Sequence, residues 1–199
     1  MEFLAIAAIS IAVIHSLAPD HYVPFVAIGK ARRWNVKKTL AFSSLAGTIH
    51  VLSSIVVGML LILGIDFLGF AETIESLSPL LLILIGSAYA ILSLIKPHSH
   101  VHSTSATMLL LVIGLSPCIP LIPLMLAAKT HAELIVATTL FGVATVLTIV
   151  ILSYLAFKAF KPPEMLHGRE DFVAGLIVAI VGILSYIIGY KHVWQDNKA

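Results

Sequence analysis

The sequence predicts an all-α membrane protein with six transmembrane helices, and two observations favour this fold class. Of the 199 residues, 59% are hydrophobic and only 11% are charged, whereas a soluble domain carries roughly 25% charged residues. The mean hydropathy is +1.06, and the apolar residues gather into stretches near the length of about 20 residues that crosses a bilayer. The net charge of +2, without a basic arm, gives no indication of nucleic acid binding.

Six apolar stretches are the candidate spans, and their helical form follows from the membrane. An isolated strand would leave its backbone groups unpaired in lipid, whereas a helix pairs them internally. The first stretch has Glu2 where a signal peptide has basic residues, so we expect it to belong to the mature protein. The expected spans lie near residues 3–28, 39–64, 78–95, 107–127, 134–157 and 172–190.

The loops between these spans differ in charge, and this difference predicts the orientation. Basic residues are more frequent in cytoplasmic loops than in outer loops. The first, third and fifth loops hold Lys30, Arg32, Arg33, Lys37, Lys38, Lys96, Lys158, Lys161 and Arg169, and the remaining segments hold Lys129, Lys191 and Lys198. We therefore expect a multi-pass protein of the cell membrane, with both termini on the extracytoplasmic side.

The first half of the chain resembles the second half at an offset of 98 residues. The segment LAPDHYVPF then aligns with LSPCIPLIP, so that Pro19 falls on Pro117 and Asp20 falls on Cys118. A unit of three spans that is repeated once must be inverted in the membrane, and inverted repeats are a recurring plan of secondary transporters.

This repeat predicts one membrane domain over residues 1–199. We expect the first repeat at about 1–95, a cytoplasmic loop at 96–106, and the second repeat at about 107–199.

Prolines interrupt the first and fourth spans at matching positions of the repeat. Pro19 and Pro24 lie in the first, and Pro117, Pro120 and Pro123 lie in the fourth. Proline removes a backbone donor and clashes with the preceding turn of a helix. The backbone groups that each break releases must face protein, water or a ligand. A proline kink without a ligand is also common in membrane helices, but two matched breaks favour a functional site.

Ionisable residues lie beside the first break, at membrane depth. They are His15, Asp20 and His21, and His50 lies in the second span. Such residues are costly in a span and usually mark a pathway or a binding site. On a regular helix His15 would lie ~500° from Asp20 and ~600° from His21 around the axis, so the side chains would diverge. A break at Pro19 allows them to converge, and His50 can add an imidazole or bond a neighbouring helix.

The residue types in this group favour a transition metal. Imidazole suits Zn, Cu, Fe and Ni, whereas Mg²⁺ and Ca²⁺ prefer oxygen ligands. Cys118, on the second break, either lines the same site or packs as a small apolar residue. The third loop contains His98, His100 and His102, and His-rich tracts of this kind can bind metal. We therefore predict metal ligands at His15, Asp20, His21, His50 and Cys118, with the loop histidines as an auxiliary site.

The segment from His15 to His21 reads H-x4-D-H and resembles the signature of the nickel–cobalt permease family (NiCoT/NicO). GTIHVLSS, at residues 47–54, is similar to that family's second motif, a histidine followed by hydroxyl residues. IGLSPCIPLIP departs from the family, because Pro-Cys stands where Asp-Thr and Glu are expected. Pro-Cys resembles instead the CcdA-type thiol carriers of the wider LysE-like superfamily, which share a three-plus-three inverted plan.

The resemblance and the polar residues together predict a secondary transporter, and not an enzyme. Its substrate would be Ni²⁺ or Co²⁺, with Zn²⁺ as a further candidate, and we expect no tightly bound cofactor. Its partners would be membrane lipid and the metal ion, and the oligomeric state is not predicted. A thiol carrier is an alternative, although it needs two cysteines and the chain has only Cys118. An exporter of small anions or amino acids is another, although Asp20 disfavours an anion.

Overall fold

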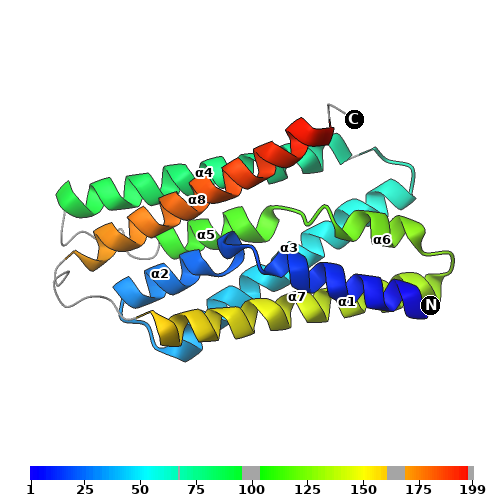
Figure 1. Ribbon diagram of the computed structural model, residues 1–199, viewed down its shortest axis with the longest axis horizontal. Helices are drawn as coiled ribbons and strands as arrows, with labels where there is room; N and C mark the ends of the chain where they lie inside the picture. Colours follow the sequence, from blue (N-terminus) through cyan, green and yellow to red (C-terminus); the bar gives the residue numbers. More distant parts are fainter. Residues whose placement is uncertain (67, 96–103, 161–168, 197–199) are drawn as a thin grey trace.

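A computed structural model describes residues 1–66, 68–95, 104–160 and 169–196 of the protein, and every regular element in these ranges is helical (Figure 1). The all-α class is therefore confirmed. The predicted auxiliary histidines, His98, His100 and His102, lie outside the described residues. The elements are α1 (Glu2–Ser16), the 3-10 turn η1 (Pro19–His21), α2 (Val23–Ala31), α3 (Val36–Ile62), α4 (Leu68–Ile95), α5 (Thr104–Leu115), α6 (Leu121–Ala127), α7 (His131–Ala159) and α8 (Glu170–Asp196).

Four of these helices are long and apolar enough to cross a membrane: α3, α4, α7 and residues Glu170–Ile188 of α8. Many of their large apolar side chains point outward, including Leu84, Ile135 and Leu147, each more than half exposed. Soluble monomers rarely expose apolar surface over such contiguous areas. The helices therefore indicate a membrane protein.

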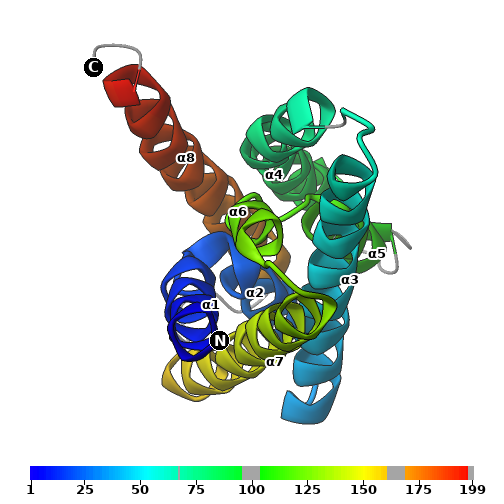
Figure 2. The same ribbon diagram turned by 90° about the vertical axis from the view of Figure 1, so that its right-hand side faces the viewer.

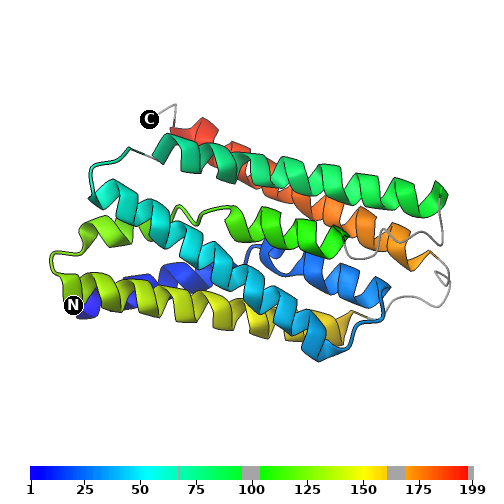
Figure 3. The same cartoon turned by 180° about the vertical axis from the view of Figure 1, so that it is seen from behind.

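The first and fourth predicted spans are each divided into two short helices. The stretch expected at 3–28 forms α1, η1 and α2, and the stretch expected at 107–127 forms α5 and α6. The interruptions coincide with Pro19 and Pro117, where a continuous helix would lose hydrogen bonds. Figure 3 shows both interruptions near the middle of the bundle's length.

The third span starts earlier in the structure than the sequence predicted. We expected it at 78–95, with Glu72 and Glu75 in a loop, but α4 begins at Leu68 and includes both glutamates. Its first turns are held by packing, because Ala71 contacts a cluster formed with Ile122 of α6 and Val57 of α3. Tertiary packing of this kind overrides the weak signal of a polar helical segment.

Helices α4 and α8 pack in antiparallel directions at very short distance. A Cβ atom on Gly86 would lie 2.7 Å from the carbonyl oxygen of Gly175, and a Cβ on Gly175 would lie 2.7 Å from that of Gly86. Ala90 and Ala179 follow these glycines by four residues. Small residues at this spacing allow membrane helices to approach closely. Figure 2, an end-on view, shows the short helix α6 between this pair and α1, α3 and α7.

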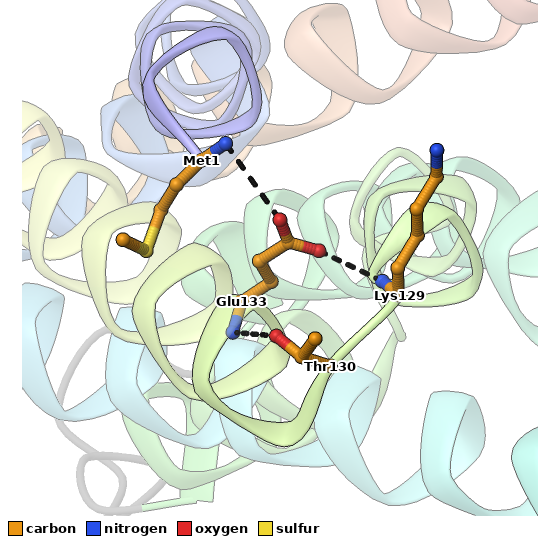
Figure 4. A network of polar contacts seen from close by, with 4 residues as sticks. All are labelled: Met1, Lys129, Thr130 and Glu133. Carbon is orange, nitrogen blue, oxygen red and sulfur yellow. Dashed lines mark hydrogen bonds and ion pairs between the residues drawn. The ribbon is translucent and has the colours of Figure 1, made fainter.

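The two ends of the bundle carry different polar contacts. Met1 and the last turns of α8 lie at one end (Figure 1). There Glu133 of α7 receives a hydrogen bond from the backbone N–H of Lys129 at 2.9 Å and lies 3.6 Å from the amino group of Met1 (Figure 4). At the opposite end Arg32 donates hydrogen bonds of 3.0 and 3.1 Å to the hydroxyl of Tyr89. That hydroxyl donates in turn to Asp171, so α2, α4 and α8 are joined there.

Gly86→Ala is expected to lower the thermal unfolding temperature of the detergent-solubilised protein. The added methyl group must push α8 away from α4, and overpacking of this kind costs about 1–3 kcal/mol. Gly69→Ala, in the same helix, is the control because a Cβ there meets nothing within 4 Å. The unfolding temperatures are measured by tryptophan fluorescence. Equal values for the two variants would contradict the close α4–α8 contact.

Candidate metal centre

Three histidine side chains meet where the first helix is interrupted. The rings of His15 and His21 have centroids 4.7 Å apart, those of His21 and His50 are 5.1 Å apart, and those of His15 and His50 are 5.7 Å apart. Nε2 of His15 lies 3.4 Å from Nε2 of His50. His21 and His50 are only 7% and 4% exposed. The three imidazoles therefore form one compact and largely buried group.

The local backbone explains how residues of one apolar stretch converge. Helix α1 ends at Ser16, and Ala18 is extended with ψ of 128°, as expected for a residue that precedes proline. The η1 turn, Pro19–His21, then separates α1 from α2, which begins at Val23. Within the break, the N–H groups of Ala18 and His21 donate to the carbonyls of His15 and Ala18, at 3.2 and 3.3 Å. The interruption thus keeps much of its backbone hydrogen bonding.

Asp20 lies beside His21. Its Oδ1 is 2.8 Å from Nδ1 of that ring. A carboxylate that accepts the Nδ1 proton fixes the tautomer of a histidine and leaves Nε2 free as a ligand, an arrangement found around many metal-bound histidines. The sequence predicted Asp20 as a direct ligand. The geometry favours Asp20 as the group that orients His21.

The second interruption contributes Cys118, which is fully buried. One ligand atom each of His15, His50 and Cys118 lie within 4.8 Å of one another. Ser54 of α3 connects the two halves at this point. Its hydroxyl accepts a hydrogen bond of 2.6 Å from the backbone N–H of Cys118 and donates one of 2.6 Å to the carbonyl of His50. The hydroxyl therefore fixes the thiol beside the imidazoles.

The spacing of the two Nε2 atoms suits a shared metal ion. In a tetrahedral site with metal–nitrogen bonds near 2.05 Å, two nitrogen ligands lie ~3.3 Å apart, and His15 and His50 are 3.4 Å apart. The ring of His50 has loose contacts with the carbonyls of Ile113 and Ser116, but its Nδ1 makes no hydrogen bond of good geometry within the described part of the chain. The donor set of two or three imidazoles and one thiol is one that borderline and soft metal ions prefer.

The structure thus brings the predicted residues together as one group. Ligand atoms of His15, His50 and Cys118 lie within 4.8 Å of one another, His21 packs edge-on against both imidazoles, and Asp20 is hydrogen-bonded to His21. The prolines occupy the helix breaks and the helix starts that follow them. Pro19 begins η1 and Pro117 lies between α5 and α6, whereas Pro24, Pro120 and Pro123 lie at the starts of α2 and α6.

Two residues near the site were not singled out from the sequence. Ser54 is one of several hydroxyl residues on α3, and nothing in the sequence separates it from the others, such as Ser44. Glu75 was placed in a loop, but α4 brings it within electrostatic range of His21, Asp20 and Cys118. Glu75 lies four residues after Ala71 and seven before Leu82, so it shares a helical face with two apolar residues. This spacing could have identified Glu75 from the sequence.

Comparison with protein-family models, with curated proteins and with solved structures finds no match to this chain. The likeness to nickel–cobalt permeases stays a prediction from the H-x4-D-H segment.

Ser54→Ala is expected to speed the modification of Cys118 by a maleimide reagent several-fold. The variant leaves the buried N–H of Cys118 without its acceptor, which costs about 1–3 kcal/mol and loosens the second break. Ser44→Ala is the matched control, because the Ser44 hydroxyl donates to the carbonyl of Ala41 in its own helix. If Ser54→Ala reacts no faster than Ser44→Ala, the hydroxyl does not hold the thiol in place.

Proposed function

We propose that the protein is a secondary transporter that moves a divalent transition-metal cation across the cell membrane. Ni²⁺ or Co²⁺ is the foremost substrate and Zn²⁺ the next. The observation that carries this proposal is the convergence of three imidazoles and a thiol at the two helix interruptions, inside a bundle of apolar helices. Ionisable groups at membrane depth are costly and usually mark the path of a substrate.

The chemistry of the donors supports a transition metal over other cations. Imidazole nitrogen and thiol sulfur bind borderline and soft ions, whereas Mg²⁺ and Ca²⁺ are bound by oxygen. The carboxylate of Asp20 faces His21, and this arrangement strengthens a histidine as a ligand. An anionic substrate would meet that carboxylate unfavourably, so the donor set argues against an anion exporter.

The arrangement of the helices supports six crossings and an inverted repeat as part of this proposal. Helices α1 and α2 would form one crossing and α5 and α6 another, each interrupted near mid-depth. The other helices pair with their counterparts, α3 with α7 and α4 with α8. The α4–α8 contact is reciprocal, because Gly86 approaches Gly175 as Gly175 approaches Gly86. Interrupted helices in matching positions are typical of the central site of such transporters.

Polar contacts join the helices at the end of the bundle that carries Arg32 and Arg33, and we infer that this end is closed. Arg32, Tyr89 and Asp171 join α2, α4 and α8 there, and Arg33 lies 3.7 Å from Glu170. The basic residues of this end would face the cytoplasm, and the termini would face outward. In alternating access these contacts would separate when the site opens toward the cytoplasm.

We expect the purified protein to bind Ni²⁺, Co²⁺ and Zn²⁺ in calorimetric titrations, and the site variants to bind them weakly. His21→Ala and His50→Ala each remove an imidazole and are expected to lose most of the affinity. Asp20→Asn removes the orienting carboxylate and is expected to weaken binding about 10–100-fold.

His131→Ala is the control, because His131 is exposed at the start of α7. Wild-type affinity in the His21 and His50 variants would show that the histidine group is not the metal site. Flux of ⁶³Ni²⁺ into proteoliposomes then tests transport itself, and wild-type binding without flux would contradict the transporter.

A further inference from the structure

Glu75 is a carboxylate on the inward side of α4. Buried residues follow this side of the helix at helical spacing, with Ala71 at 0% and Leu82 at 1% exposure. Glu75 lies four residues after Ala71 and seven before Leu82, so the three share one face. Ala71 packs against α3 and α6, and α6 begins directly after the second interruption. Glu75 therefore lies on the side of α4 that faces the rest of the protein.

The position of Glu75 relative to the site is shown by its electrostatic neighbours. His21, Asp20 and Cys118 lie within the range over which its charge acts. Glu75 is half-buried, whereas Glu72, three residues earlier, is exposed. Within the described part of the chain, Glu75 makes no hydrogen bond or ion pair that would neutralise its carboxylate. The carboxylate of Asp20, in contrast, is hydrogen-bonded to His21.

A carboxylate without a partner matters at this position because the metal ion that would enter is positively charged. A cation that leaves water for an apolar interior is costly unless an opposite charge compensates it. Imidazole and thiol groups are not anionic before they bind a metal, and the carboxylate of Asp20 is hydrogen-bonded to His21. Glu75 lies in the early turns of α4, toward the end of the bundle that holds both termini (Figure 1), so an ion that enters from this end meets it on the way to the histidines.

We propose that Glu75 is a further carboxylate of the cation path, which attracts a divalent cation from the terminus-bearing end and favours it over a monovalent one. This inference rests on the proposed metal site. Coulomb attraction is proportional to the charge of the ion, so Glu75 stabilises a divalent ion about twice as much as a monovalent ion at the same position.

The test compares Glu75→Gln with Glu72→Gln on the same helix, using Ni²⁺ as the divalent probe and Ag⁺ as a soft monovalent probe. We expect Glu75→Gln to weaken Ni²⁺ binding at least tenfold and Ag⁺ binding by about half as much on a logarithmic scale. Glu72→Gln is expected to bind both ions as the wild type does. Glu75→Asp keeps the charge and is expected to retain Ni²⁺ affinity within a few-fold, even if Glu75→Gln does not fold.

The outcomes separate this inference from the proposed function. If His50→Ala loses Ni²⁺ binding while Glu75→Gln binds like Glu72→Gln, the metal site stands and the role of Glu75 is wrong. Equal losses for Ni²⁺ and Ag⁺, or loss in Glu75→Asp as large as in Glu75→Gln, would indicate a structural role and also overturn it. If the wild type does not bind Ni²⁺, or His50→Ala binds it unchanged, the metal site itself is wrong.

Discussion

The interruption of the first apolar helix between Ser16 and Val23 is the constraint on which the candidate site depends. A continuous helix would direct His15 and His21 to different sides. Ending α1 at Ser16 and inserting the η1 turn places their rings 4.7 Å apart and opposite His50 of α3. The break leaves backbone groups that must be paired in an apolar interior, and hydrogen bonds of 3.2–3.4 Å between neighbouring residues pair several of them. One local change in backbone direction thus assembles the polar group.

Much of this site could be predicted from the sequence, because its signals are local. Pro19 identifies the break, and the break explains why costly polar residues stand beside it. The aligned position of Cys118 in the second half pointed to the same place, and the structure puts its ligand atom within 4.8 Å of those of His15 and His50. The role of Asp20 is not decided by sequence spacing, which does not distinguish a ligand from a carboxylate that orients His21.

What the sequence did not reveal depends on contacts between distant segments. The start of α4 at Leu68 depends on packing of Ala71 against α6 and α3, and two glutamates nearby made this segment resemble a loop. Ser54 was one hydroxyl among several on α3, and only the position of the second break gives it the N–H of Cys118 as a donor. The site is also unequal between the halves of the chain, because the imidazoles and Asp20 come from the first half and the thiol from the second.

X-ray absorption spectroscopy of the Zn²⁺-loaded protein is a direct test of the metal centre, because it reports the atoms bound to the metal. We expect nitrogen ligands at ~2.0 Å and one sulfur at ~2.3 Å, and loss of the sulfur in Cys118→Ser with the nitrogen retained. A shell of oxygen alone, or a wild-type spectrum that Cys118→Ser and His50→Ala leave unchanged, would contradict a metal centre built from His15, His50 and Cys118.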